Sequence, residues 1–211
     1  MRTRIKICGV KTINDLQLVV EAGADAVGFV VDVPSSPRSM TPEEARRLVK
    51  ATPVFVETVA VTLPRDLDHL KSVIDVVEAD AVQVHGLRVN GEVRDTLSGV
   101  KLIAAIPASP SAFELALEAS HHSDAILLDT PGERGGTGRT HDWSVSRRVR
   151  DLIHPKPMIL AGGLNAGNVK KAIREVKPFA VDVSSGVEAA PGVKDRVKVL
   201  EFVRSVMEAE A

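Results

Sequence analysis

Eight short apolar runs alternate with eight segments of helical spacing along the chain. The runs are nearly continuous in Val, Ile, Leu and Ala, which is typical of parallel strands that are buried on both faces. We expect strands at residues 4–8, 26–30, 54–61, 81–84, 100–106, 125–128, 158–160 and 179–183. We expect helices at residues 12–22, 41–50, 66–76, 91–97, 111–120, from about 144, 166–176 and 194–208.

This alternation predicts an α/β protein, a single-domain (β/α)8 TIM barrel. Eight is the number of strand–helix units that closes such a barrel. The chain has 211 residues and no segment that reads as a linker, so we expect one domain over residues 1–211. An open, doubly wound sheet with fewer strands remains the alternative.

Several helix boundaries carry recognisable signals. Thr41 is an expected N-cap, Pro42 suits the first helical position, and Glu43 favours the positive end of the helix dipole. Gly23 is expected to end the first helix. Asn165 is expected to cap the helix that begins near residue 166.

Composition excludes several classes of function. The formal net charge of −1 favours neither nucleic acid nor an anionic membrane surface, and the aromatic content of 3% offers no platform for stacking bases. No apolar run reaches the roughly 20 residues that span a bilayer. One cysteine forms no internal disulfide or thiolate metal site, and no signal peptide is recognisable, so we expect a cytoplasmic protein.

Small and polar residues follow the expected strands, at the end of a barrel where active sites form. The glycines Gly162 and Gly163 follow the seventh strand. Asp182, at the end of the eighth strand, is followed by the segment Ser184, Ser185 and Gly186. Glycine turns and hydroxyl groups after these two strands predict a phosphate site, because backbone N–H groups there approach an anion closely. Tight turns without a ligand are the alternative.

The loop after the sixth strand, "DTPGERGGTGRTHDW", is long and rich in glycine. A mobile cover over a ligand explains such a loop, and a disordered surface loop is the alternative. It lacks the GK[ST] of a phosphate-binding P-loop.

Cys8 ends the first strand and Asp129 ends the sixth, so a barrel places them across its mouth from each other. A thiolate and a carboxylic acid can act as base and acid, although a lone cysteine is more often inert core. Lys6, with one residue between it and Cys8, is expected to point to the other face of the strand and not to activate the thiol. Arg38 is either a fork for a carboxylate or a solvated charge, and His85 is either structural or catalytic.

The segments "KICGVK", "ADAVGFV…SPRSM", "VQVHG", "LLDT…GGTGRTHDW", "ILAGGLNAGNV" and "AVDVSSGVE…PGVKD" occur in this order along nearly the whole chain. Together they resemble the phosphoribosylanthranilate isomerase family of tryptophan biosynthesis. The resemblance implies a (β/α)8 barrel and an Amadori rearrangement of N-(5-phosphoribosyl)anthranilate to 1-(2-carboxyphenylamino)-1-deoxyribulose 5-phosphate, with no cofactor and no metal.

The resemblance also assigns residue roles. It implies Cys8 as general base, Asp129 as general acid and Arg38 beside the anthranilate carboxylate. The substrate-binding residues expected in all are Arg38, His85, Gly136, Thr137, Gly138, Gly162, Gly163, Asp182, Ser184, Ser185 and Gly186. The chain departs from the family pattern at His141, where Phe is common, and at Thr62, an apolar position near the rim. Both departures concern substrate packing more than proton transfer.

Two other functions remain open at this point. One is another phosphosugar isomerase or epimerase on the same barrel, and the other is a non-catalytic barrel that binds a phosphorylated metabolite. In each case the expected partner is a small phosphorylated molecule, with no nucleic acid and no membrane, and the protein is a monomer or a homodimer.

Overall fold

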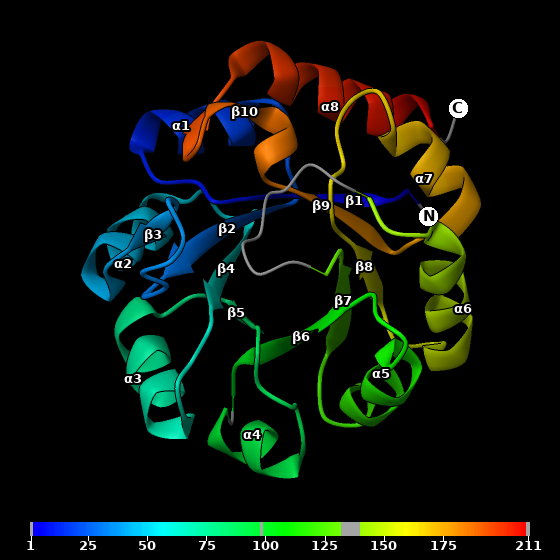
Figure 1. Ribbon diagram of the computed structural model, residues 1–211. Coiled ribbons are helices and arrows are strands. Elements are labelled where there is room, and N and C mark those ends of the chain that lie inside the picture. Colours follow the sequence, from blue (N-terminus) through cyan, green and yellow to red (C-terminus); the bar gives the residue numbers. More distant parts are fainter. Residues whose placement is uncertain (1, 98, 132–139, 210–211) are drawn as a thin grey trace.

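The computed structural model describes residues 2–97, 99–131 and 140–209, and they form a closed barrel of parallel strands surrounded by helices (Figure 1). The barrel strands are β1 (Arg4–Cys8), β2 (Ala26–Val31), β4 (Glu57–Thr62), β5 (Ala81–Val84), β6 (Lys101–Pro107), β7 (Ala125–Asp129), β8 (Met158–Leu160) and β9 (Ala180–Val183). Each pairs with the next in parallel, and β1 closes the ring by pairing with both β2 and β9. The expected fold class is confirmed.

The helices are α1 (Ile13–Glu21), α2 (Pro42–Ala51), α3 (Leu67–Val77), α4 (Gly91–Thr96), α5 (Ala112–Ser120), α6 (Trp143–Ile153), α7 (Val169–Val176) and α8 (Arg196–Glu208). The N-cap of α2 is Thr41, whose hydroxyl accepts a hydrogen bond from the Glu44 N–H while Glu44 bonds back to the Thr41 N–H. This capping box confirms the expected start of the helix. None of the described helices is long and apolar enough to cross a membrane.

Three boundaries differ from the prediction by more than one residue. The strand expected from residue 54 begins at Glu57, because Phe55 has a φ of 77° and the chain turns there before it enters the sheet. Helix α7 begins at Val169 after Asn168, and Asn165 does not cap it: its side-chain oxygen accepts the Gly167 N–H within the preceding loop. Helix α8 begins at Arg196 and not at Lys194.

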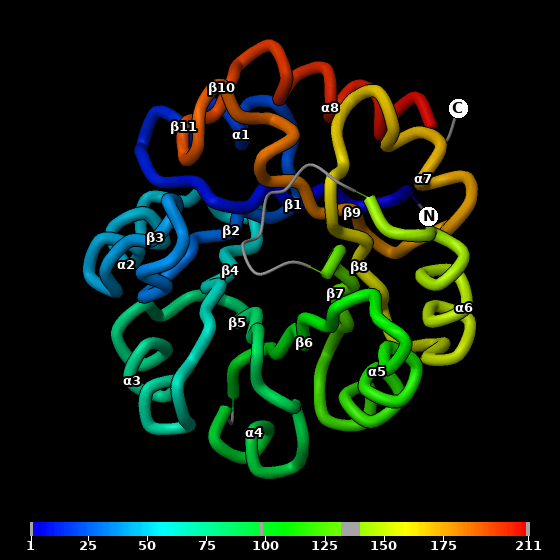
Figure 2. The backbone as a smooth tube through the Cα atoms, viewed as in Figure 1, coloured from blue at the N-terminus to red at the C-terminus, as the bar shows by residue number. Residues whose placement is uncertain are grey.

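Four short elements were not expected: β3 (Ser39–Met40) beside β2, the 3-10 turn η1 (Ser185–Val187), and the hairpin β10 (Glu188–Ala190) with β11 (Val193–Lys194). The hairpin turns at Gly192, whose φ is 82°. Gly192 lies against Pro37 and the Lys11 side chain, so the hairpin sits beside the end of β1 and the loop after β2 (Figure 2). Lys194 therefore belongs to a strand that covers the barrel mouth.

Two apolar layers hold the fold together. A larger core packs the outer faces of the strands against the helices, with Phe29 and Phe202 among its fully buried side chains. A smaller core fills the barrel interior and includes Cys8, Val59 and Leu127. Side chains alternate between the two layers along every strand, so every second residue of a strand can reach the interior and the site.

Candidate active site

Lys6 and Cys8 point into the barrel from the same face of β1. Side chains two residues apart on a strand share a face, so the expectation that Lys6 points away from Cys8 was wrong. The Lys6 ammonium lies 2.9 Å from a carboxylate oxygen of Asp182, its register partner on β9. Lys6 is 3% exposed and Asp182 is 9% exposed, so a buried ion pair occupies the barrel interior.

This ion pair is the electrostatic centre of the site. Lys6 and Asp182 both act on the pKa of Cys8 on β1, of His85 after β5 and of Asp129 on β7. Charges act at this strength only over short distances in a poorly solvated interior. The structure therefore brings together four residues expected at the site and adds Lys6 to them.

Cys8 is buried, with 7% of its surface exposed. Burial raises the pKa of its thiol above the ordinary value; the positive charges of Lys6 and Lys194 oppose this shift, and the negative charge of Asp182 adds to it. Because the pKa of Cys8 is higher than that of Asp129, its thiolate is the stronger base of the two. At neutral pH the thiol is mostly protonated.

Asp129 ends β7 and is partly buried. Burial, followed by repulsion from Asp182, raises its pKa to about 6, although the Thr130 N–H donates to it at 2.7 Å and Lys6 attracts it. A carboxyl group with this pKa is partly protonated near neutrality, as a general acid must be.

His85 lies one residue beyond β5 and is held by Gln83 on the same strand. The Gln83 side-chain amide lies 2.7 Å from Nε2 of His85 and holds the ring in place. Burial, assisted by the charge of Lys6, lowers the pKa of His85 to about 4. The ring is therefore neutral at physiological pH, and Nδ1 is the ring nitrogen left for a ligand.

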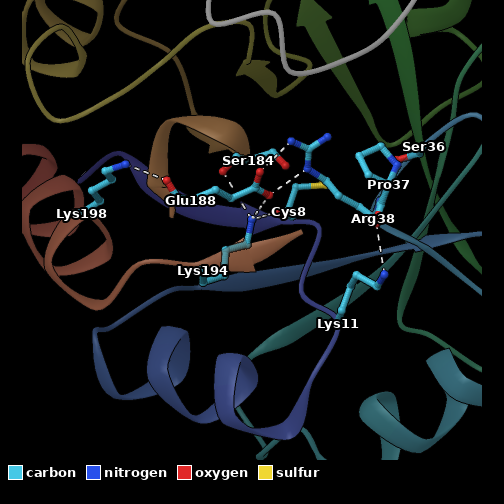
Figure 3. Close-up of polar contacts among 9 residues, drawn as sticks. All are labelled: Cys8, Lys11, Ser36, Pro37, Arg38, Ser184, Glu188, Lys194 and Lys198. Carbon is cyan, nitrogen blue, oxygen red and sulfur yellow. Dashed lines mark hydrogen bonds and ion pairs between the residues drawn. The ribbon is translucent and has the colours of Figure 1, made fainter. Parts of the chain in front are cut away.

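Arg38 does not lie in solvent. Its Nε and Nη2 donate to the two carboxylate oxygens of Glu188 at 2.8 and 2.7 Å, in a buried two-point ion pair (Figure 3). This pairing fixes the plane of the guanidinium and leaves Nη1 as the edge available to a ligand carboxylate. The guanidinium of Arg38 was expected to bind a substrate carboxylate. In the structure, Glu188 occupies one edge of it.

Glu188 and Lys194 were missed by the sequence reasoning. Lys194 donates to Glu188 at 3.0 Å, to the carbonyl oxygen of Cys8 at 2.6 Å and to that of Ser184 at 3.3 Å, so it ties the ends of β1 and β9 to the hairpin (Figure 3). Burial opposes ionisation of Glu188, but its bonds to Arg38 and Lys194 outweigh this and lower its pKa. Both residues lie in the segment "SSGVE…PGVKD", whose resemblance to the family could have pointed to them.

The turns after β8 and β9 touch each other. A Cβ atom at Gly186 would lie 1.9 Å from the Leu164 carbonyl oxygen, and one at Gly162 would lie 2.2 Å from the Thr130 hydroxyl. Gly162 and Gly163 have φ values of 89° and 65°. Only glycine permits this approach and this backbone, so the predicted cradle residues Gly162, Gly163, Ser185 and Gly186 lie together at the barrel mouth.

Ser184 adds a hydroxyl group to this region. Among the described residues, its buried Oγ has no hydrogen-bond partner. A buried hydroxyl without a partner costs about 1–3 kcal/mol, and a ligand oxygen would satisfy it. Its place in the turn after β9, at the barrel mouth, makes a ligand oxygen the candidate partner.

Two departures from the family pattern have structural explanations. His141 bridges the Thr130 hydroxyl at 3.0 Å and Ser146 of α6 at 2.6 Å, and so fastens the end of β7 to that helix. Thr62 is fully buried on the side of β4 that carries Ala60, which faces the helices. It ends β4 near the rim, as expected, but its side chain faces the helices and not the barrel interior. Three expected phosphate residues, Gly136, Thr137 and Gly138, lie outside the described residues.

A cavity of about 800 Å³ lies at the opposite end of the barrel, where the strands begin. Among its lining residues are Arg4, Ala81 and Ala180 at strand starts, and the exposed pair Val54 and Phe55. Neither Cys8 nor Asp129 borders it. It lies at the N-terminal end, away from the barrel mouth, and Lys6 also lines it, so it reaches the interior ion pair from below.

The comparisons with known proteins agree in one family. The family described as N-(5'phosphoribosyl)anthranilate (PRA) isomerase matches residues 5–205. The N-(5'-phosphoribosyl)anthranilate isomerase of Methanothrix thermoacetophila is 46% identical over 97% of this chain and 98% of its own, and that of Halobacterium salinarum is 43% identical over 95% and 94%.

Solved structures give the same result. The phosphoribosyl anthranilate isomerase of Thermotoga maritima is 40% identical, with a TM-score of 0.87 over 98% of this chain and 99% of that one. A phosphoribosyl anthranilate isomerase solved in complex with reduced 1-(o-carboxyphenylamino)-1-deoxyribulose 5-phosphate is 39% identical, with a TM-score of 0.84. With nearly full coverage in both sequence and structure, this chain belongs to the phosphoribosylanthranilate isomerase family.

Proposed function

We propose that this protein converts N-(5'-phosphoribosyl)anthranilate to 1-(2-carboxyphenylamino)-1-deoxyribulose 5-phosphate in tryptophan biosynthesis, with Cys8 as general base and Asp129 as general acid. Membership of the family and the complex solved for a relative support the reaction. The observation that carries the residue roles is the pair of proton carriers, a buried thiol and a carboxyl group of raised pKa, beside one interior ion pair.

The first step opens the ribose ring. The carboxyl group of Asp129 gives its proton to the ring oxygen, the bond between C1 and that oxygen breaks, and the nitrogen lone pair forms a C1=N double bond. The positive iminium group makes the hydrogen on C2 acidic.

The second step moves that hydrogen. The Cys8 thiolate removes the proton from C2, the C–H electrons form a C1=C2 double bond, and the lone pair returns to nitrogen. The resulting enolamine has a hydroxyl group on C2; this hydroxyl loses its proton while C1 gains one, which gives the ketone. Positioned acid and base groups each contribute typically 10²–10⁴-fold to such a reaction.

The other site residues hold the substrate for these transfers. The free Nη1 edge of Arg38 suits the anthranilate carboxylate, and the turns at Gly162, Gly163 and Ser184–Gly186 suit the phosphate. Fixing both ends of the substrate places C1 and C2 between the acid and the base, and such positioning supplies much of the remaining rate enhancement. The neutral ring of His85 and the carboxylate of Asp182 are the groups left to contact the sugar hydroxyls.

Turnover measured by loss of substrate fluorescence tests the proposal. Cys8→Ser and Asp129→Asn are each expected to lower kcat by about 10²–10⁴-fold, with KM changed only a few-fold. Asp151→Asn, on the exposed surface of α6, is the control and should be unchanged. Full activity of Cys8→Ser would refute the role of the base. Tight binding of ribose 5-phosphate without any turnover by the unmodified protein would instead indicate a binding barrel.

We also propose that two copies associate through the end of the barrel where the strands begin. Phe55 is 99% exposed and Val54 is 81% exposed, beside the cavity of about 800 Å³ that they help to line. In a two-fold dimer the same surface meets itself, so the protruding Phe55 of each copy can enter the cavity of the other. One structure of the Thermotoga maritima relative is described as mutually generated monomers of a dimeric isomerase.

The molar mass in solution, from light scattering, tests this association. The unmodified protein is expected to be a dimer and Phe55→Asp a monomer, while Leu117→Asp, at an exposed apolar position on α5, should remain dimeric. A monomeric unmodified protein at micromolar concentration would refute the proposal.

A further inference from the structure

We propose that Lys6 is a positioning residue of the reaction: held by Asp182, its ammonium group stabilises the ionised form of Cys8. This inference deepens the proposed role of Cys8 as base. It concerns a residue that reaches the substrate only through another group, and it can be measured without turnover.

The first support is the space around Gly28 on β2. Gly28 is the register partner of Cys8 on the neighbouring strand. A Cβ atom there would lie 2.9 Å from the Cys8 sulfur and 3.1 Å from the Lys6 ammonium. The sulfur and the ammonium thus converge on the one position of the wall that carries no side chain. Gly28 has an ordinary negative φ, so glycine is required there by crowding and not by the backbone.

The second support is the way Lys6 is held. A lysine that is 3% exposed would normally lose its charge on burial. Here burial lowers the pKa of Lys6, but Asp182 and then Cys8 raise it by more than burial lowers it. The net shift of the pKa is therefore upward. The ion pair with Asp182 at 2.9 Å therefore keeps a permanent positive charge beside the sulfur.

The charged groups that face Cys8 come from several elements. Lys6 lies on β1 itself, Asp182 on β9 and Lys194 on β11, and Arg38 reaches Cys8 from the loop after β2. Lys194 also donates to Glu188 and to the Cys8 carbonyl oxygen, and the Nε/Nη2 edge of Arg38 is bonded to Glu188. Lys6 is the cation with the largest effect on the thiol, and Asp182 opposes it.

This arrangement predicts shifts of opposite sign for the two partners. Lys6→Met removes the stabilising charge and leaves Asp182, so the pKa of the thiol should rise by at least about one unit. Asp182→Asn removes the repelling charge and leaves Lys6, so the pKa of the thiol should fall. Loss of packing alone would not move the thiol in opposite directions.

The composition of the chain makes the measurement direct. Cys8 is the only cysteine, and the chain has no tyrosine, so the ultraviolet absorbance of the thiolate can be followed to alkaline pH without a tyrosinate signal. The rate of alkylation by iodoacetamide at fixed pH reports the same ionisation, and one unit of pKa changes the thiolate fraction tenfold.

The experiment compares Lys6→Met, Lys6→Arg and Asp182→Asn with the unmodified protein. Lys6→Arg keeps the charge and should restore most of the shift seen in Lys6→Met. Lys101→Met is the matched control, because it removes a lysine paired with Glu57 at the other end of the barrel, and it should leave the thiol unchanged.

Lys6→Met leaves a buried carboxylate unpaired, and such a change is strongly destabilising. If it does not fold, Lys6→Met/Asp182→Asn removes both charges together, and its thiol pKa should exceed that of Asp182→Asn. A thiol pKa that differs by less than a few tenths between these proteins overturns the inference. Inactivity of Cys8→Ser tests the base separately, so the two proposals can fail independently.

Discussion

Arg38 and Glu188 are 150 residues apart in the chain and face each other in a buried pair with two hydrogen bonds, at 2.8 and 2.7 Å. The pair joins the loop after β2 to the hairpin after β9. It therefore fixes the arginine proposed to bind the substrate carboxylate and ties the hairpin to the barrel mouth at the same time.

Glu188→Gln should impair both functions of this pair. Removal of one partner of a buried ion pair leaves the other charge uncompensated, at a cost of about 3–5 kcal/mol. We expect this loss of unfolding free energy in urea, together with a raised KM because Arg38 is no longer fixed. Glu118→Gln, in the exposed pair with Arg88, should cost less than about 1 kcal/mol. Equal losses for the two variants would contradict this interpretation.

Asp129→Asn should make the protein far less active but more stable at alkaline pH. The pKa of Asp129 is about 6 in the folded protein and 3.8 in the unfolded chain. The folded state thus holds this proton more tightly, and its stability falls as the pH rises from 3.8 through 6. At 1.36 kcal/mol per unit, the fall is at most about 3 kcal/mol.

The amide cannot ionise and avoids this loss. Urea unfolding at pH 8 should therefore show a more stable variant, and at pH 4 the advantage should disappear. Asp151→Asn, at an exposed site, should show no such difference. An advantage that is the same at both pH values would mean that ionisation is not its cause.

The pH profile of kcat/KM should have an acidic limb near pH 6 and a plateau above it. The active form needs protonated Asp129 and ionised Cys8. Below pH 6 the thiolate fraction rises tenfold per unit while Asp129 stays protonated, so the rate rises. Above pH 6 the protonated fraction of Asp129 falls as fast as the thiolate fraction grows, until the thiol itself ionises.

The same profile would arise if the two groups were interchanged, so the thiolate absorbance must be recorded over the same range. The thiolate fraction is too small to detect across the acidic limb, so the absorbance should stay flat there and rise only at alkaline pH. The phosphate of the substrate titrates near pH 6 as well, and its ionisation should be measured by phosphorus NMR and divided out. A thiolate signal that rises with the acidic limb would assign that limb to Cys8.

Ser184→Ala should stabilise the free protein and weaken substrate binding. The Ser184 Oγ is buried and has no partner among the described residues, so its removal should stabilise the free protein by up to about 1 kcal/mol. If this hydroxyl binds the ligand, KM should rise about tenfold, which corresponds to 1.4 kcal/mol.

Ser123→Ala is the matched control for that variant. The Ser123 hydroxyl is buried too, but it donates to the Ala119 carbonyl oxygen at 2.7 Å. We expect a loss of about 1 kcal/mol in stability and no change in KM. A KM that is unchanged in Ser184→Ala would remove Ser184 from the binding site.

The sequence by itself determined the barrel and the place of most site residues. Strand period, helix caps such as Thr41 and the order of eight units are local properties, and they depend only on neighbours in the chain. Cys8, Asp129 and the glycine turns could be predicted because each ends or directly follows a strand. The orientation of Lys6 was also predictable, because residues two apart on a strand point to the same face.

The tertiary structure alone decided which of these residues act on one another. Lys6 pairs with Asp182, 176 residues away, because the barrel closes by pairing its first strand with its last. Glu188 and Lys194 reach Cys8 and Arg38 because a short hairpin folds back over the mouth. Such long-range contacts leave no periodic trace in the chain, and the burial they create sets the proton affinities of Cys8, His85 and Asp129.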